Sequence, residues 1–301
     1  MAPGARRRWL VTGASGQLGT CLGARLRDAA EHELVAAYDH AALDVCDAGA
    51  LRKAIDAARP DVVANAAAMT HVDRCEGEPA LAEAANAVAP GLLAEACRAA
   101  GAQLVHLSTD YVFAGDGGQP YRESDPTAPR SVYGRTKLEG ERRVLAALPD
   151  AIVVRTAWVF GPGRNFVRTI LLAAARARAG GPGLRVVADQ RGSPTYADDL
   201  AAAVIRLVEG GGTGLYHVAN AGIATWWELA RAAVDEWGHP ELEIAKLRTE
   251  EYPVPAPRPA WSVLDISRAE RLGVSMRPWR EALRAYLHSA ASPLRELGAT
   301  P

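Results

Sequence analysis

Short apolar runs alternate with segments of helical spacing through the first half of the chain. The apolar runs are continuous, and they stand at residues 7–13, 33–39, 61–68, 102–110 and 151–160. The helical segments between them cover residues 17–30, 47–58 and 80–100. Continuous strands that are each followed by a helix indicate a parallel sheet covered on both faces. With right-handed crossovers, the pattern predicts a doubly wound α/β fold.

The pattern changes after residue 159, where glycine and proline clusters divide the chain into shorter elements. These clusters read FGPGRN, AGGPGL, EGGGTG and PVPAPRPA, and they indicate loops rather than one long linker. An apolar run at 214–220 and a helical segment at 198–208 are expected to return to the main sheet. The sequence therefore predicts a main domain of residues 1–160 with returning segments near 195–220, and a smaller, partly interleaved lobe formed mainly by residues 161–301.

Composition and charge narrow the class of protein. The 301 residues are 49% hydrophobic, and 34 basic residues against 35 acidic ones leave a net charge of -1. This balance indicates neither nucleic-acid binding nor attraction to a membrane surface. The first apolar run ends at Gly13, too early for a signal peptide or a membrane span. The four scattered cysteines have no zinc or disulfide spacing, so we expect a soluble protein of the reducing cytoplasm.

A glycine-rich turn, VTGASGQLGT, joins the first predicted strand to the first predicted helix. Gly13, Gly16 and Gly19 would allow a tight turn, close approach of the backbone to a pyrophosphate, and close packing of helix on strand. The helix N-terminus would then bind the anion. A glycine triplet also suits an ordinary strand-to-helix turn, but its place here favours a dinucleotide-binding domain.

Residues at the ends of the next strands extend this candidate cofactor site. Asp39 follows Gly19 by twenty residues, where a carboxylate accepts hydrogen bonds from ribose hydroxyls and repels a 2′-phosphate. Asp44 would reach the adenine rim or serve as a loop aspartate. The choice between NADH and NADPH stays open. The residues assigned to cofactor binding, two of them from the site described next, are Gly13, Ser15, Gly16, Gln17, Leu18, Gly19, Asp39, Asp44, Val45, Asn65, Ala66, Ala67, Tyr133 and Lys137.

The segment SVYGRTKLEGERRV places Tyr133 and Lys137 four residues apart on a predicted helix, so both side chains face one side. An adjacent ammonium lowers the pKa of a phenol and makes it a usable proton donor for a carbonyl. Such pairs also occur on solvated helix faces. Two observations favour a site: only three of the 34 basic residues are lysines, and Thr109 ends a strand at the sheet edge where α/β folds bind ligands.

Seven segments extend in order over nearly the whole chain: VTGASGQLG, NAAAMTHVD, STDYVF, VYGRTKLEGE, RTAWVFGPGRNF, DQRGSPTYADDLA and PRPAWSVLD. With them the chain resembles the extended short-chain dehydrogenase/reductases, and within these the dTDP-4-dehydrorhamnose reductases. The resemblance implies a Rossmann fold whose smaller lobe binds substrate. It also implies NADPH- or NADH-dependent reduction of the C4 keto group of a dTDP-4-keto-6-deoxyhexose, from dTDP-4-dehydro-L-rhamnose to dTDP-L-rhamnose. Thr109, Tyr133 and Lys137 would be the catalytic triad, with Tyr133 donating the proton.

The resemblance further implies residues that face the nucleotide sugar. Trp158 matches an aromatic position beside the sugar, although a tryptophan at a strand end also suits the core. Arg258 would bind the diphosphate, because a guanidinium forms bidentate hydrogen bonds. Asn165, Gln190 and Arg258 each also suit an ordinary loop. The residues assigned to substrate binding are His71, Val72, Thr109, Asp110, Tyr111, Trp158, Asn165, Gln190 and Arg258.

The chain departs from the family pattern in two places. His71 stands where many relatives have a small residue, either as a surface histidine or as a sign of altered sugar specificity. The glutamates of the metal-bridged dimer described for some members cannot be placed in this sequence. We therefore predict no metal site, and a homodimer stays open.

Three alternative functions fit parts of the sequence. A nucleotide-sugar dehydratase would have Asp-Glu after Thr109, but Asp110 and Tyr111 follow here, which disfavours dehydration. A sister reductase of antibiotic deoxysugar assembly, such as a dihydrostreptose synthase, fits the same motifs and the alanine- and arginine-rich composition. A non-catalytic cofactor-binding subunit, like the regulatory partner of methionine adenosyltransferase, would not need the triad that stands here.

Overall fold

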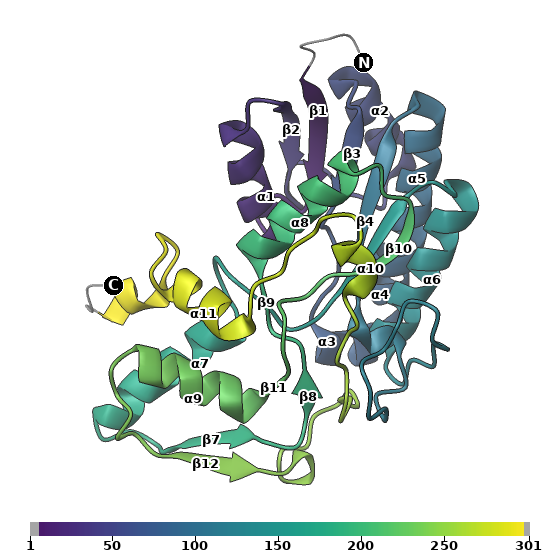
Figure 1. Cartoon of the computed structure of the whole chain (residues 1–301). Coiled ribbons are helices and arrows are strands. Elements are labelled where there is room, and N and C mark those ends of the chain that lie inside the picture. Colours follow the sequence, from purple (N-terminus) through teal and green to yellow (C-terminus); the bar gives the residue numbers. More distant parts are fainter. Residues whose placement is uncertain (1–5, 298–301) are drawn as a thin grey trace.

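Six parallel strands form the central sheet in a computed structural model that describes residues 6–297 (Figure 1). From one edge to the other they are β2 (His32–Tyr38), β1 (Arg7–Thr12), β3 (Val62–Asn65), β4 (Gln103–Thr109), β5 (Ile152–Thr156) and β10 (Gly214–His217). The chain reverses its direction of winding between β1 and β3, which is the switch point of a doubly wound sheet. The predicted fold class is confirmed.

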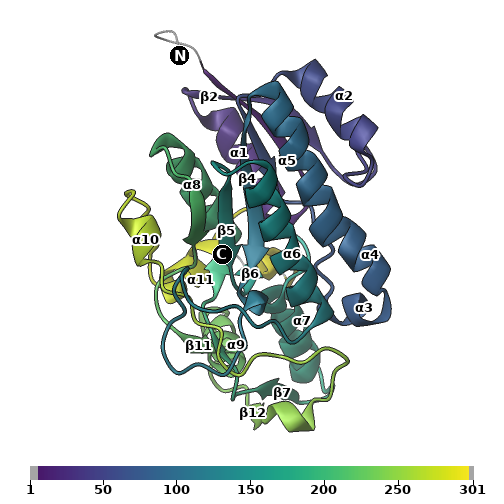
Figure 2. The same cartoon turned by 90° about the vertical axis from the view of Figure 1, so that its right-hand side faces the viewer.

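Helices cover both faces of this sheet, as the two views in Figures 1 and 2 show. One face carries α1 (Gln17–Asp28) and α8 (Ala197–Glu209), and the other carries α2 (Ala48–Ala58), α5 (Ala89–Ala100) and α6 (Val132–Ala147). Trp9 and Val11 of β1 pack with α1 and α8, whereas Leu10 packs with α2 and α5. Because successive side chains point to opposite faces, a strand covered on both sides is apolar throughout.

The predicted helix 80–100 exists, but it is not one regular helix. It comprises α4 (Pro79–Glu83), a π-helical segment (Ala84–Val88) and α5, and the short α3 (Val72–Gly77) precedes it. Within the π segment, Asn86 is buried and bonds the Met69 backbone through both ends of its amide. A Cβ at Gly140 of α6 would lie 2.1 Å from the Asn86 carbonyl oxygen, so α6 packs directly on this segment.

The predicted strand 151–160 is wrong in its second half. The strand β5 ends at Thr156, and β6 (Val159–Phe160) pairs with β9 (Thr195–Tyr196) outside the central sheet. Between them Trp158 has a φ of 47°, in the left-handed region that non-glycine residues rarely adopt. This turn carries the chain out of the central sheet and into the smaller lobe.

The smaller lobe lies in the lower part of Figure 1 and has an apolar cluster of its own. Its main helices are α7 (Phe166–Arg178), α9 (Trp226–Glu236) and α11 (Trp279–Leu287). Its strand pairs are β7 (Leu184–Val187) with β12 (Ile244–Leu247), and β8 (Arg191–Gly192) with β11 (Ala224–Thr225). Outside this lobe, the 3₁₀ turn at residues 110–112 follows β4, and α10 (Ser267–Glu270) packs with the α1 and α8 cluster through Ala269. Within residues 6–297, two further 3₁₀ turns lie at residues 249–251 and 293–297.

The chain crosses between the two parts more than once. After the first part of the smaller lobe, α8 packs on α1 and β10 pairs with β5 at the edge of the central sheet. Arg25 of α1 and Asp198 of α8 form an ion pair at 2.7 Å. The division into residues 1–160 and 161–301 stays a prediction. No helix within residues 6–297 combines the length and the apolar character needed to cross a bilayer.

Candidate active site

The glycine loop lies between β1 and α1, at the switch point of the sheet. Gly13 has a φ of 69°, and a Cβ there would lie 2.6 Å from the backbone of Ala66 and Ala67, which follow β3. A Cβ at Gly19 would lie 2.2 Å from the Gly13 carbonyl oxygen, so α1 packs closely on the loop. Any side chain at Gly13 would fill the cradle between this loop and the end of β3. The cradle and the adjoining N-terminus of α1 fit the pyrophosphate of a dinucleotide.

The other residues assigned to this loop differ in solvent exposure. Ser15 and Gly16 are exposed, whereas the Leu18 side chain is buried in the core, so only the backbone of Leu18 can meet a cofactor. The Gln17 Oε1 atom is buried and has no hydrogen-bond partner within residues 6–297. A buried acceptor without a partner is costly, which makes Gln17 a candidate to accept a hydrogen bond from a ligand.

Two aspartates follow β2 and cap their own loops. Asp39 Oδ1 accepts hydrogen bonds from the N–H groups of Ala41 and Ala42, at 3.1 and 3.0 Å. Asp44 is exposed and accepts from the N–H group of Cys46, and Val45 between them is half-buried. Asp39 therefore stands at the carboxyl edge where it was expected, while the loop-aspartate interpretation of Asp44 has a contact to support it.

Thr109 is the last residue of β4 and caps the 3₁₀ turn that follows. Its hydroxyl donates to Asp110 Oδ1 at 3.0 Å and accepts from the Tyr111 N–H group at 3.2 Å. Asp110 is buried, and its Oδ2 atom has no hydrogen-bond partner in the described part of the chain. Burial raises the pKa of Asp110 to about 6. A carboxyl group that titrates near neutral pH thus adjoins the Thr109 hydroxyl.

Tyr133 lies in the first turn of α6 and meets this strand end. Ser131 caps the helix by accepting from the Gly134 N–H group at 3.1 Å. A Cβ at Gly134 would lie 2.2 Å from the Tyr111 carbonyl oxygen, so only glycine lets α6 approach so closely. The Tyr133 and Tyr111 rings then meet edge to face, with centroids 5.5 Å apart. The structure therefore brings Thr109, Tyr111 and Tyr133 together.

Lys137 lies one turn further along α6, with its side chain buried at 2% exposure. Its Nζ atom donates to the Leu107 carbonyl oxygen at 2.5 Å and lies 3.4 Å from His106 Nε2. Burial lowers the pKa of Lys137 to about 8, while Glu141 on the same helix acts in the opposite direction. Lys137 is not on a solvated helix face, because β4 holds its amino group inside the protein.

The pKa of Tyr133 is raised, not lowered as expected from the sequence. Burial raises the pKa of the Tyr133 phenol above its ordinary value of about 10; the Thr109 hydroxyl opposes this rise, and Asp110 adds to it. The Lys137 amino group directs its contacts to the Leu107 carbonyl oxygen and to His106. Tyr133 is held as a protonated phenol, which is the form that a proton donor needs.

Trp158 forms a stack with Trp226, the first residue of α9. Their ring centroids are 3.7 Å apart and their planes differ by 8°. A Cβ at Gly192 of β8 would lie 2.4 Å from the Trp158 ring, so glycine is needed beneath it. Gln190 accepts from Trp226 Nε1 at 3.1 Å and donates to Thr249 at 3.0 Å. Gln190 thus braces Trp226 and Thr249, and its expected contact with substrate stays a prediction.

Asn165 also has a structural partner for each end of its amide. Its Oδ1 atom accepts from the Arg168 N–H group and caps α7, and its Nδ2 atom donates to the Gly161 carbonyl oxygen and the Tyr286 hydroxyl. The side chain is 7% exposed. Asn165 thus caps α7 in the structure, and its expected contact with substrate stays a prediction.

Arg258 lies next to the triad region, on the side of α3. Its guanidinium pairs with Asp73 at 2.7 Å and is close enough to lower the pKa of Tyr111, against the larger effect of burial. Val72 at the start of α3 is half-buried, and His71 before it is exposed. These residues form one rim of the candidate site, with Arg258 as its cation.

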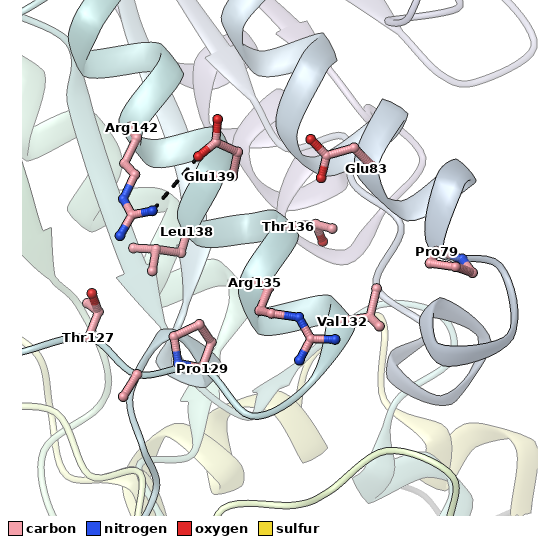
Figure 3. A pocket seen from close by; sticks show the side chains of 11 residues that line it. Pro79, Glu83, Thr127, Pro129, Val132, Arg135, Thr136, Leu138, Glu139 and Arg142 are labelled. Atoms are coloured by element: carbon pink, nitrogen blue, oxygen red, sulfur yellow. Dashed lines mark ion pairs between the residues drawn. The ribbon is translucent and has the colours of Figure 1, made fainter.

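A surface pocket of about 700 Å³ lies on the outer side of α6 (Figure 3). Glu139 and Arg142 of α6 line it and pair at 3.9 Å, and Glu83 faces them from α4. Neither Tyr133 nor Lys137 lines this pocket, although both stand on the same helix. We therefore place the candidate site at the carboxyl edge of the sheet, where Thr109, Tyr133 and Lys137 lie, and not in this pocket. Within residues 6–297, no three histidine, cysteine or acidic side chains gather to hold a metal ion.

The expectations from sequence left out residues that support the site. His106 contacts Lys137, and Trp226 supports Trp158. Glu141 forms a buried ion pair with Arg155 at 2.7 Å and accepts from Ser108 Oγ. Three of these four had a signal in the sequence: His106 and Arg155 are polar residues inside apolar strands, and Glu141 follows Lys137 by one helical turn.

Known proteins are similar to this chain in sequence and in fold. The family described as RmlD substrate binding domain matches residues 7–292. The dTDP-4-dehydrorhamnose reductase of Mycolicibacterium smegmatis is 46% identical over 283 residues, covering 92% of this chain and 84% of that protein. A probable dTDP-4,6-dihydroxy-2-methyloxan-3-one 4-ketoreductase of Streptomyces antibioticus is 48% identical over 281 residues, covering 92% of this chain and 93% of that protein.

A solved structure agrees with both sequence matches. The crystal structure of dTDP-4-dehydrorhamnose reductase from Bacillus anthracis, in complex with NADP, superposes with a TM-score of 0.87 at 33% identity. The match covers 94% of this chain and 99% of that one. With the parallel sheet, the glycine cradle and the Thr109–Tyr133 meeting described above, these matches show that the chain belongs to the RmlD substrate-binding-domain family.

Proposed function

We propose that this protein reduces the C4 keto group of a dTDP-4-keto-6-deoxyhexose with NADPH or NADH, converting dTDP-4-dehydro-L-rhamnose to dTDP-L-rhamnose. The meeting of Thr109 and Tyr133 at the carboxyl end of β4, beside the glycine cradle, is the observation that carries the proposal. It supports a ketoreductase because a protonated phenol and a hydroxyl there can both reach one carbonyl oxygen. The names of the relatives support the substrate class, and NADP in the Bacillus anthracis structure supports the cofactor.

In this mechanism a bound reduced nicotinamide supplies the hydride that adds to C4. Tyr133 donates its phenol proton to the carbonyl oxygen, which becomes the C4 hydroxyl. The Thr109 hydroxyl donates a hydrogen bond to the same oxygen and orients it; Thr109 then gives up its bond to Asp110. Lys137, held by β4, would bind the nicotinamide ribose and, when charged, would favour the phenolate that remains on Tyr133.

The rim residues would hold the rest of the substrate. The Trp158 ring, supported by Trp226, offers an apolar face to the sugar. Arg258 would bind the diphosphate, and its pairing with Asp73 keeps the guanidinium in place. His71 and Val72 stand on the same rim, where they would set sugar preference. We place this activity in the cytoplasm and expect neither nucleic acid nor a membrane as partner; a second copy of the chain is an open partner.

A second candidate substrate has an observation of its own. The Streptomyces antibioticus relative is named a 4-ketoreductase of dTDP-4,6-dihydroxy-2-methyloxan-3-one, and its identity to this chain is 48%. A sister reductase of antibiotic deoxysugar assembly, such as a dihydrostreptose synthase, would use the same catalytic residues. Both alternatives keep the reaction type and change the sugar, so the reaction type is the firmer part of the proposal.

The experiment that tests the proposal follows loss of reduced-nicotinamide absorbance with dTDP-4-keto-6-deoxyglucose, with and without a 3,5-epimerase, for NADPH and NADH separately. We expect consumption only with the epimerase. Tyr133→Phe should lower kcat by about 10² to 10⁴ and keep cofactor binding, because it removes only the proton donor. Tyr216→Phe is the matched control, since Tyr216 is a buried tyrosine of β10 away from the site.

Each outcome separates the candidates. Product identification by NMR distinguishes rhamnose from another 4-reduced sugar. Consumption without the epimerase would replace the rhamnose substrate by a non-epimerised keto-sugar. Cofactor binding with no turnover on any dTDP-keto-sugar would overturn the reductase proposal in favour of a cofactor-binding subunit.

A further inference from the structure

Behind Lys137, a row of buried polar groups crosses the central sheet. Thr12 at the end of β1 donates to Asn65 Oδ1 at 2.8 Å, and Asn65 Nδ2 lies 3.1 Å from His106 Nδ1. The His106 Nε2 atom then lies 3.4 Å from Lys137 Nζ. All four side chains are at most 3% exposed. The hydrogen positions in such a closed row are determined by its donors and acceptors.

One backbone group fixes the direction of the row. The Ala67 N–H group can only donate, and it donates to the Asn65 amide at 3.2 Å, so the atom that it meets must be the oxygen Oδ1. The Asn65 NH₂ group therefore faces His106. Because an NH₂ group can only donate, His106 Nδ1 must be a bare acceptor. In a neutral imidazole the hydrogen is then on Nε2, on the side of Lys137.

This tautomer distinguishes the two forms of Lys137. An uncharged amine can accept a hydrogen bond from the His106 Nε2–H group through its lone pair while it donates to the Leu107 carbonyl oxygen. An ammonium has no lone pair and would set its own N–H against the ring N–H. We propose that Asn65 and His106 are positioning residues for Lys137: Asn65 holds His106 as the Nε2–H tautomer, and this group favours the uncharged amine.

The other ionisable groups around Lys137 act differently. Glu141, one turn along α6, favours the ammonium, and this carboxylate is shared with Arg155 of β5. Tyr133 is the remaining ionisable group of α6 on this side, and it is protonated. His106 is the ionisable group that β4 contributes, and burial holds its pKa well below the ordinary value. The Nε2–H group therefore opposes Glu141.

The functional consequence of this inference rests on the proposed function. In that reaction, an uncharged Lys137 cannot stabilise the Tyr133 phenolate. The inference would make Asn65 and His106 set the alkaline limit of the reaction, where activity falls as pH rises through the pKa of Lys137, about 8. The tests below need neither substrate nor turnover, so a failed reductase assay and a failed inference remain distinguishable.

The first test reads the tautomer directly from the ring ¹⁵N chemical shifts of the histidines in the wild-type protein, with His106 assigned by its loss in His106→Gln. We expect a protonated Nε2 and a bare Nδ1. A protonated Nδ1 at His106 would overturn the proposal, whatever any variant does.

The second test titrates Lys137 by ¹³C NMR of protein labelled in lysine. Only Lys53, Lys137 and Lys246 contribute signals, and Lys53 and Lys246 are exposed. His106→Asn keeps an amide near the position of Nδ1 and removes the Nε2–H group that faces Lys137. The midpoint pH of the Lys137 titration should therefore rise by about one pH unit. His217→Asn makes the same replacement at another fully buried strand histidine, whose contact is the Tyr121 carbonyl, and should leave the midpoint in place.

An unchanged Lys137 midpoint in folded His106→Asn would overturn the proposal. If that variant does not fold, His106→Gln keeps more of the ring volume and puts an amide near the Nε2 place. Its carbonyl oxygen can turn toward the ammonium, so the midpoint should again rise, and a midpoint that stays or falls would overturn the proposal.

Discussion

At the scale of single residues, burial shifts three titrating groups of the site toward their uncharged forms. Asp110 and Tyr133 hold their protons more tightly than in water, and Lys137 holds its proton less tightly. Each shift has desolvation as its largest cause. The site thus brings together three groups whose charged forms are costly in this environment. Such shifted pKa values are typical of groups that take part in proton transfer.

Asp110→Asn should stabilise the protein at pH 8. The folded-state pKa of Asp110, about 6, lies above the unfolded value of 3.8, so the folded state binds more protons between these pH values. Wild-type stability should therefore fall as pH rises from about 4 to about 6. The variant avoids this cost, on the order of 3 kcal/mol above pH 6. Urea unfolding at pH 4.5 and 8 measures it; an equal difference at both pH values would contradict the assignment to Asp110.

At this scale the sequence predicted the positions of site residues that stand on a clearly predicted strand end or helix. Thr109, Tyr133 and Lys137 stand on the predicted strand end and helix. The direction of the Lys137 side chain was not predictable, because it depends on a histidine from another element. Asn165 and Gln190 show the opposite limit: an amide suits a ligand, a helix cap or a tryptophan N–H equally well, and only the folded neighbours decide.

At the scale of elements, α6 depends on one buried ion pair. Glu141 bonds Arg155 of β5 through both oxygens, at 2.9 and 2.7 Å, and both side chains are at most 4% exposed. The pair fastens the helix that carries Tyr133 and Lys137 to the strand beside β4. The same helix also has a solvent-exposed pair between Glu139 and Arg143 at 2.8 Å.

Glu141→Gln should destabilise the protein by about 3 to 5 kcal/mol, because it leaves the Arg155 charge buried without a counter-ion. Glu139→Gln is its control on the same helix and should cost less than about 1 kcal/mol, since solvent screens the exposed pair. Urea unfolding at neutral pH gives both values. Equal costs for the two variants would show that burial does not decide the strength of the Glu141 contact.

The Trp158 turn gives a second prediction for an element. In Gly192→Ala the added methyl group would lie 2.4 Å from the Trp158 ring, so the ring must leave its stack on Trp226. We expect the exciton signal of the stacked pair in circular dichroism to weaken and KM for the nucleotide sugar to rise at least about tenfold, with cofactor affinity unchanged. Gly183→Ala, where no atom lies within 4 Å of the new Cβ, should change none of these. An intact exciton signal in Gly192→Ala would contradict the predicted displacement.

The elements themselves were largely predictable, with two exceptions. Apolar continuity identified the sheet strands because both faces of the sheet are covered. It could not show that the run 151–160 breaks at Trp158, since apolar residues suit the central sheet and the smaller lobe equally. It also could not show the π segment at 84–88, because one extra residue in a helical turn leaves the local apolar pattern almost unchanged.

At the scale of the whole molecule, the first 160 residues do not complete the central sheet. The apolar cluster on the α1 face includes Leu200 and Val204 of α8, and β10 covers the edge of β5. A fragment of residues 1–160 should therefore show no cooperative unfolding transition, because it would expose that face and that edge. Thermal melts followed by circular dichroism measure this, with the full chain as control. A sharp transition in the fragment would show that the sheet folds without α8 and β10.

The repeated passage of the chain between the two parts also bears on how such proteins diversify. A single recombination event between two relatives would join α1 of one parent to α8 of the other, across the contacts of Arg25 with Asp198. Whole-lobe exchange is thus a poor route to a new sugar preference in this architecture. Point substitutions at the rim, at positions such as His71 and Trp158, leave those contacts intact, so inherited variation in substrate is expected to concentrate there.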